Sequence, residues 1–516
     1  MKINKYIGFI FFSLLFVGLT SCSDEGDEIT SYELDRVLAP FKIEYVLNDV
    51  VNLTLKWKDL ESADSYIVEL YTDSLEFLEE NFVAMDEVLT NQFEYTLKGT
   101  TQYSARIKAV STTNNDSKWN GIAFKTSFKS VFLDFKKGDI TETSLRFRFP
   151  PGTDATSIVL KSGKDEIRRE VTAEEITNGA ILFTDLKSNV TYFATLFDGD
   201  KKIGEISETT IMEGTIKVKP SDDLKALLEA ANEGDAFLLD EGVYLDGEVV
   251  TISTSVTIMG KRAAEPTIQA QFELDNEAGA NTPTVVFKLL KLDGKAMTTD
   301  NAVRIISKTG NFGDIVLESV EVKDYNKALI GVNDLVGTIN SIKIEDCIIS
   351  NIMTNGSEAI DVRKAYVEKL TINNSTFANV APARSFIRMD DSSGSFESGL
   401  NSTVEVTNNT FYKVNDKHDS KGFFYVRFKT NSNTFKNNLM VESNGIFSKE
   451  SKTSEIVCGD NNYFNAPNYM AGGAVPEAKI DSASPKTENP EFEDVENGNF
   501  KVGNGMVKSG DPRWLN

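Results

Sequence analysis

A short pattern recurs in the C-terminal half of the chain, and this repeat limits the possible folds more than any other feature. The copies are alternating apolar segments that end in small polar residues, at 316–319, 344–347, 372–375, 406–409 and 435–438. Their alignment gives one column, separated by steps of 27, 28, 34 and 29 residues, that contains Ser319, Asp346, Asn374, Asn408 and Asn437. A period of this length is typical of one turn of a solenoid. Stacked polar side chains can hydrogen-bond along such a ladder, so we interpret the column as structural.

A second strand recurs between these copies, at 359–363, 386–390 and 424–428. Alternation sends Ile360, Ile387 and Phe424 inward and charged residues outward. The outward residues are the predicted glycan-contact residues Asp361, Arg363, Arg388, Asp390, Tyr425 and Arg427. Stacking predicts Asp361 beside Arg388 and Tyr425. It also predicts Arg363 beside Asp390 and Arg427. Opposite charges on neighbouring strands would form a salt-bridge ladder; the alternative is a sugar-binding groove, because these side chains suit hydroxyl and uronate groups.

The start of this half has the pattern of a capping helix followed by strands. Ser221 is the expected N-cap, and positions 224, 227, 228 and 231 place apolar residues on one helical face. Strand-like segments follow at 235–239 and 256–259. This succession resembles the entry to the pectate-lyase-like β-helices, in which an amphipathic helix covers the open end. The resemblance implies a right-handed parallel β-helix with an N-terminal capping helix over residues 214–516.

The segments before it indicate two β-sandwiches, so the predicted fold class is all-β. Residues 38–127 alternate in short runs, with Trp57 in a core position and Leu97 and Tyr103 spaced as in a tyrosine corner. This span resembles a fibronectin type III module. Residues 128–213 look like a second copy, with the corner repeated at Leu186 and Tyr192 but without the tryptophan. We expect both to act as spacers rather than as binding modules.

The first residues are typical of a lipoprotein leader. Lys2 and Lys5 precede an apolar run at 7–18, and small residues precede Cys22. The run is shorter than the roughly 20 residues that span a membrane. We expect a signal peptide and lipobox at 1–22, lipidation of Cys22, and an acidic tether at 23–37. The tether resembles those of Bacteroidota lipoproteins on the outer face of the outer membrane, which implies that localisation.

Composition excludes several functions. The formal charge of −24 repels phosphate backbones, so nucleic acid is not an expected partner. Cys347 and Cys458 fit no metal or redox motif, and we expect them to be small buried hydrophobes. The single histidine, His418, lies in the polar stretch 415–421. We expect it to be a loop residue, which excludes serine or cysteine nucleophiles that depend on an imidazole.

Two resemblances define the functional hypotheses. The C-terminal segments at 489–502 and 510–514 are similar to the closing segments of β-helical proteins from Bacteroidota glycan-utilisation loci. Residues 356–364, followed by 386–388, resemble the chondroitinase B and alginate lyase family. That resemblance implies Lys364 as base, Arg388 as partner of the developing charge, and Glu358 and Asp361 as calcium ligands, although the two acids are spaced differently from that family's.

We therefore predict an outer-membrane lipoprotein of a polysaccharide-utilisation system that binds a uronate-containing polysaccharide through its β-helix. Its expected partners are the polysaccharide, the membrane and other glycan-utilisation proteins. A polysaccharide lyase that acts by β-elimination and an adhesin or structural surface protein remain as alternatives.

Overall fold

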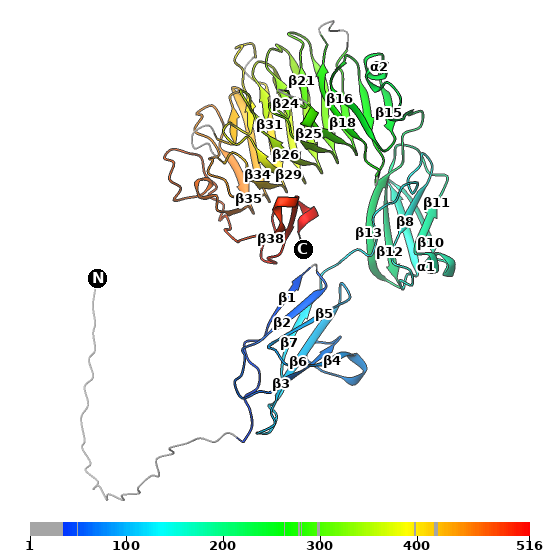
Figure 1. Ribbon diagram of the computed structural model, residues 1–516, viewed down its shortest axis with the longest axis vertical. Helices are drawn as coiled ribbons and strands as arrows, with labels where there is room; N and C mark the ends of the chain where they lie inside the picture. The colour runs from blue at the N-terminus through cyan, green and yellow to red at the C-terminus, as the bar shows by residue number, and fades with distance from the viewer. Residues whose placement is uncertain are drawn as a thin grey trace, which may run out of the picture.

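The computed structural model describes residues 35–515 apart from 49, 263, 277–278, 280, 297–299, 397–398 and 417–421 (Figure 1). The predicted signal peptide with Cys22, most of the predicted tether, and His418 lie outside the described residues. No helix in the described part is long and apolar enough to cross a membrane. This part is all-β, with two antiparallel sandwiches followed by two long parallel sheets.

The first sandwich has one sheet of three strands and one of four. The smaller sheet has the order β1 (Glu44–Asn48), β2 (Asn52–Lys56), β5 (Gln92–Thr96), and the larger has the order β4 (Phe82–Val88), β3 (Ser65–Tyr71), β6 (Gln102–Val110), β7 (Asn120–Lys125). Trp57 is buried in the core and meets the edge of Tyr66 at a centroid distance of 5.2 Å. The Tyr103 hydroxyl accepts a hydrogen bond from the Lys98 amide at 3.0 Å. This tyrosine corner and the paired sheets are fibronectin type III-like, as predicted.

The second sandwich has the same corner on a different core. It pairs β8 (Leu145–Arg148) with β11 (Ala180–Phe183), and its larger sheet has the order β10 (Asp165–Glu170), β9 (Ser157–Ser162), β12 (Thr191–Asp198), β13 (Lys201–Thr209). The short helix α1 (Ala173–Asn178) begins with a capping box between Thr172 and Glu175. The Tyr192 hydroxyl accepts from the Lys187 amide at 2.9 Å. Phe147, fully buried, packs among other phenylalanines in the core, so this module is fibronectin type III-like without a tryptophan.

The rest of the chain forms two parallel sheets, which together we call the parallel-sheet region. The first sheet contains, in order, β14 (Ile216–Val218), β15 (Asp235–Leu239), β17 (Val256–Met259), β19 (Val285–Lys288), β22 (Phe312–Glu318), β25 (Thr338–Glu345), β28 (Tyr366–Asn373), β31 (Asn401–Thr407), β34 (Thr430–Lys436) and β36 (Ile456–Gly459). The second contains β33 (Phe424–Val426), β30 (Ile387–Met389), β27 (Ile360–Val362), β24 (Ile330–Val332), β21 (Val303–Ile305), β18 (Thr267–Leu274), β20 (Lys291–Asp293), β23 (Glu321–Lys323), β26 (Ile348–Ile352), β29 (Thr376–Val380), β32 (Thr410–Tyr412), β35 (Leu439–Val441) and β37 (Asn462–Phe464), with β16 (Val243–Ile252) paired to β18.

The chain reaches this arrangement by winding. From β22 to β33, each turn contributes one strand to the first sheet and then two strands to the second, as in the succession β25, β26, β27 and again in β28, β29, β30. Equivalent strands of successive turns pair in parallel, which gives the stacked row in Figure 1. Apolar residues from all turns, such as Ile344, Ile372 and Phe435, join one continuous buried core.

The polar column has a different physical basis from the predicted ladder. Its five residues all adopt left-handed backbone, with φ between 49° and 57°: Ser319, Asp346, Asn374, Asn408 and Asn437. They form the corner between the two sheets, where short polar side chains tolerate this conformation best among non-glycine residues.

The main hydrogen-bonded ladder lies one residue later. The amides of Ser375, Asn409 and Asn438 each donate to the side-chain oxygen of the next turn, namely Asn409, Asn438 and Asn461, at 2.9 Å. These four residues are fully buried. The predicted column contains one such bond, from Ser319 Oγ to Asp346 Oδ2 at 2.7 Å, so the predicted polar ladder is present at this corner, although these three bonds lie one residue later.

A short helix packs on the core at the start of the parallel-sheet region, and the C-terminal segment packs on the outer face of the second sheet. The helix α2 (Leu224–Glu229) buries Leu224 and Leu228 against the core, and its N-cap is Asp223 rather than the predicted Ser221. Near the C-terminus, β38 (Phe492–Asp494) and β39 (Asn499–Val502) form an antiparallel hairpin, and its Val502 packs on the outward Leu439 and Val441 of β35. The chain then crosses several turns, and Arg513 contacts the Asp346 carbonyl at 2.9 Å.

Candidate functional site

The predicted glycan-contact residues lie on the outer face of β27, β30 and β33. The strand register aligns Asp361 with Arg388 and Arg388 with Tyr425. On the other side, Asp361 aligns with Gly331, and Gly331 aligns with Arg304. The stacking inferred from alternation is thus present, and it places these side chains on adjacent turns.

Two of these residues face outward but are covered. Asp361 is 0% exposed and Asp390 is 3% exposed. Arg363 lies over Asp361 with Nε–Oδ1 and Nη2–Oδ2 distances of 2.9 and 2.6 Å. Arg388 Nη2 lies 3.0 Å from Asp390 Oδ2. Contrary to the expectation for a contact surface, these two carboxylates are counterions beneath longer arginine side chains.

The candidate calcium ligands are also occupied by guanidinium groups. Glu358 is 2% exposed, and Arg384 binds both its oxygens, at 2.7 and 3.1 Å. Asp361 is held by Arg363 in the same two-pronged way. No cluster of three His, Cys, Asp or Glu side chains in the described ranges could hold a metal ion. A calcium site needs six to eight oxygen ligands, so Glu358 and Asp361 do not fit the role that the lyase resemblance implies.

Lys364, the candidate base, does not take part in these arginine–carboxylate ion pairs. Its Nζ is 3.1 Å from Asp334 Oδ1, and both side chains are well exposed. A base for β-elimination has to stand within hydrogen-bonding reach of the proton that it removes, next to the group that neutralises the sugar carboxylate. Lys364 instead forms a surface ion pair at the rim of the face.

Two further residues of this group of ion-paired side chains, Arg384 and Glu450, were not predicted from the sequence. Both come from loops between strands, where alternation carries no information about direction. Glu450 Oε2 lies 3.4 Å from Arg427 Nε. The complete cluster, which we call the arginine strip, contains four guanidinium and four carboxylate groups: Arg363, Arg384, Arg388 and Arg427 with Glu358, Asp361, Asp390 and Glu450.

The ion pairs keep the arginine strip charged. The hydrogen bond with Asp361 is the largest influence on Arg363 and raises its pKa above the ordinary arginine value. For Arg427, burial is the largest influence and acts to lower the pKa. The carboxylates of Asp390 and Glu450 and the Tyr425 hydroxyl together outweigh it, so that the pKa is raised. Both groups therefore stay cationic at any physiological pH.

One part of the strip keeps free hydrogen-bonding capacity. The guanidinium carbons of Arg388 and Arg427 lie 5.6 and 5.5 Å from the centroid of the Tyr425 ring. Arg388 is 20% and Arg427 31% exposed in the side chain. The Nε atom of each is buried and makes no hydrogen bond among the described residues, so a ligand can reach only the exposed part of each group. Because a guanidinium group carries five N–H donors, these exposed parts can still donate to a ligand beside the Tyr425 ring.

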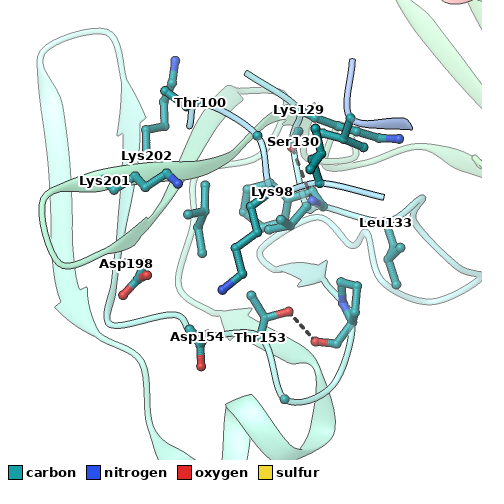
Figure 2. A pocket seen from close by; sticks show the side chains of 18 residues that line it. Lys98, Thr100, Lys129, Ser130, Leu133, Thr153, Asp154, Asp198, Lys201 and Lys202 are labelled. Carbon is teal, nitrogen blue, oxygen red and sulfur yellow. Dashed lines mark hydrogen bonds between the residues drawn. The ribbon is translucent and has the colours of Figure 1, made fainter. Parts of the chain in front are cut away.

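Two cavities lie away from the strip, at the joints between modules. The larger, of about 580 Å³, is between the two sandwiches, and the ammonium group of Lys98 points into it beside Asp154 and Asp198 (Figure 2). Lys201 Nζ crosses this joint to Thr101 Oγ1 at 3.0 Å. The smaller, of about 290 Å³, lies where the second sandwich meets the parallel-sheet region.

That second joint is closed by an ion pair. Arg262 Nε lies 2.6 Å from Glu208 Oε2, and the Glu208 side chain is only 5% exposed. Neither cavity is lined by a residue that the sequence predicted for the site, so the arginine strip remains the candidate site.

Comparison with known proteins agrees with this division of the chain. Residues 242–380 match the domain of unknown function DUF4957, and residues 404–514 match the domain of unknown function DUF5123. A comparison with curated proteins gives no match.

Solved structures match the N-terminal part. A segment of two fibronectin type III domains from chicken tenascin is 18% identical over 33% of this chain and 97% of its own, with a TM-score of 0.24. The first three fibronectin domains of chicken CNTN1 are 14% identical over 34% of this chain and 67% of theirs, with a TM-score of 0.15. The central fibronectin type III array of RIM-binding protein is 14% identical over 36% of this chain and 66% of its own, with a TM-score of 0.14. Its parallel-sheet region is thus similar to two families of unknown function.

Proposed function

We propose that this protein is a lipid-anchored glycan-binding protein of the bacterial outer surface, and that it holds uronate-containing polysaccharide on the arginine strip. In this account the parallel-sheet region is a right-handed parallel β-helix of the pectate-lyase-like type. The winding of one strand and then two strands per turn supports the helix. Parallel crossover connections are right-handed in about 98% of cases, which supports the hand.

The partly exposed guanidinium groups of Arg388 and Arg427 beside Tyr425 carry the proposal. A uronate carboxylate beside Arg388 and Arg427 would accept charge-assisted hydrogen bonds, each with a contribution of roughly 1.5 to 3 kcal/mol. The Tyr425 ring holds both guanidinium groups in place through cation–π contacts. Because the chain carries a formal charge of −24, a polyanion is attracted by these local contacts rather than by the overall field.

Binding explains the strip better than catalysis does. A lyase has to keep a base and a charge-neutralising group together at the reacting carbon. Here Lys364 pairs with the exposed Asp334, and the carboxylates of Glu358 and Asp361 are covered by Arg384 and Arg363. Binding of a uronate by Arg388 and Arg427 requires none of these side chains to move.

The rest of the chain suits a tethered binder. A lipidated Cys22 would hold the protein at the membrane, and the tandem sandwiches would act as spacers that raise the parallel-sheet region above the surface. The acyl chains would supply the anchor, since lipidation with two or more chains gives stable membrane attachment.

The test is incubation of the purified chain with a panel of polymers, comprising uronate polysaccharides and neutral polysaccharides of similar length. Retention is measured by affinity electrophoresis and unsaturated product by ultraviolet absorbance. The proposal expects selective retention by uronate polymers without absorbance growth. Growth of absorbance would favour the lyase, and equal retention by all polymers, or by none, would contradict the proposed surface.

A further inference from the structure

A second surface, on the first sandwich, has the composition of a protein interface. Five of the exposed large apolar side chains of the described chain fall within residues 75–89: Leu75, Leu78, Phe82, Met85 and Leu89. Apolar side chains that gather on one surface, rather than scatter singly, mark interaction sites. Leu75 and Leu78 lie on the loop that leads into β4, Phe82 and Met85 on the strand itself, and Leu89 directly after it.

The strand at the centre of this segment has a free edge. β4 is the outermost strand of its sheet and pairs only with β3. It extends over seven residues, from Phe82 to Val88. A free edge of this length presents unpaired backbone N–H and C=O groups that can pair with another strand. The edge and the apolar side chains therefore occur on the same element.

The apolar surface continues from this edge across the outer face of the sheet. The Tyr71 ring contacts Phe77 and Phe82 at centroid distances of 5.4 and 5.7 Å. The Arg106 guanidinium then lies over Tyr71, Phe77 and Trp119, at 5.2, 5.2 and 4.6 Å. Aromatic residues and arginine are the residues most enriched at the energetic centres of protein interfaces.

The loop before β4 is fixed in a conformation that leaves its apolar side chains exposed. Leu75 and Phe77 have φ values of 70° and 55°, a left-handed backbone that large side chains rarely adopt. The buried carboxylate of Asp73 fixes the loop by accepting hydrogen bonds from Ser104 and from the Leu78 amide. At Gly121 a Cβ atom would lie 2.8 Å from the Phe77 ring, so glycine lets the loop lie on the sheet.

Charge selects the kind of partner. The segment 75–89 contains five acidic residues and neither lysine nor arginine. The acids are Glu76, Glu79, Glu80, Asp86 and Glu87, and none of them forms an ion pair within the described chain. A second copy that paired through β4 would bring two such segments together, and their like charges would repel. A basic strand would meet opposite charge along its length.

We propose that β4 and the adjoining aromatic face are a docking surface for an extended, basic segment of a partner protein, which adds as a further strand beside β4. Main-chain hydrogen bonds to the free edge give the affinity, and the apolar and acidic side chains select alternating apolar and basic residues. This surface is separate from the arginine strip and does not depend on glycan binding.

The second sandwich supplies a matched control. Its edge strand β10 is also unpaired on one side and carries one exposed apolar residue, Ile167. It contains Arg168 and Arg169 among Asp165, Glu166 and Glu170, so its edge carries charges of both signs, unlike the edge of β4. A basic segment should therefore discriminate between these two edges of the same protein.

The test uses the full chain and a fluorescent synthetic peptide of alternating lysine and valine, as long as β4, with an acidic peptide of alternating glutamate and valine as its counterpart. Binding is followed by fluorescence anisotropy at low ionic strength, and the site by hydrogen exchange of the amides in residues 82–88. We expect the basic peptide to bind, to protect these amides, and to bind about tenfold more weakly to Met85→Lys and to Glu79→Lys/Glu80→Lys, with no change for Ile167→Lys.

Four results would overturn the inference. The basic peptide does not bind, the acidic peptide binds as tightly, the amides of β4 exchange at an unchanged rate, or Ile167→Lys weakens peptide binding as much as Met85→Lys does. Dimerisation of the chain that Met85→Lys abolishes would assign the surface to a second copy instead. Because glycan retention is measured separately, failure here leaves the proposed glycan function standing.

Discussion

Substitution of Asn438 by alanine should destabilise the last turns of the parallel-sheet region by about 2 to 4 kcal/mol. The side chain is fully buried, and its Oδ1 accepts from the Asn409 amide at 2.9 Å and from Asn409 Nδ2 at 3.1 Å. Its Nδ2 donates to the Val406 carbonyl at 2.9 Å. Alanine would leave the buried Asn409 amide without its acceptor, and an orphaned buried group costs about 1 to 3 kcal/mol. The lost bond to Val406 and the small cavity account for the remainder.

The neighbouring residue gives a sharp contrast. Asn437 is exposed and has a φ of 53°. Glycine adopts this conformation without strain but gains entropy in the unfolded chain, and the two effects are each about 1 kcal/mol and opposite in sign. Asn437→Gly should therefore change the stability by less than about 1 kcal/mol.

Hydrogen exchange followed by mass spectrometry is the appropriate assay, because a solenoid need not unfold in one step. We expect faster exchange in β31, β34 and β35 for Asn438→Ala, unchanged exchange in β19 and β22, and wild-type exchange throughout for Asn437→Gly. Equal effects of the two variants would refute the distinction between the buried ladder and the left-handed corner.

Three further predictions concern other parts of the chain. Burial raises the pKa of the thiols of the buried Cys347 and the half-buried Cys458 to about 12, so alkylation of both in the native protein at about pH 8 should be slow and should become fast after denaturation; fast native labelling of Cys347 or Cys458, located by mass spectrometry, would contradict this protection. Asp361→Asn should lower the unfolding free energy by roughly 1 to 3 kcal/mol because it leaves Arg363 partly buried without its counterion, and an unchanged thermal unfolding midpoint would argue against that pair. Cys22→Ala should move the protein from the membrane to the soluble fraction on immunoblots, whereas membrane retention of the variant, correctly cleaved, would count against lipid anchoring.

The periodicity of the sequence predicted which residues face the core of the sheets, but not which outward residues are exposed to solvent. Ile360, Ile387 and Phe424 are inward and buried as alternation predicts, because a strand has only two faces. Alternation also places Asp361 outward, but it cannot indicate that Arg363, two residues later, folds over it. Burial of an outward residue depends on the length of its neighbours, which no periodicity encodes.

Loops and edges escaped prediction for a related reason. Arg384 and Glu450 join the arginine strip from loops, whose direction follows from tertiary contacts. The helical cap at Asp223 rather than Ser221 shows the same uncertainty at an element boundary. The exposed edge of β4 could not be predicted, because the order of strands in a sheet determines which of them is outermost.

The central claim, that the arginine strip holds uronate, is tested most directly by the affinity of Arg388→Ala for the polymer that the wild type retains. Arg304→Ala is the matched control, since Arg304 lies in the same outward column, three turns away, and is 44% exposed in the side chain. Loss of a charge-assisted contact of roughly 1.5 to 3 kcal/mol should weaken retention by about tenfold or more. We expect this loss for Arg388→Ala and no loss for Arg304→Ala, with both variants folded by circular dichroism. Unchanged retention by Arg388→Ala would contradict the account and leave the strip as a salt-bridge ladder alone.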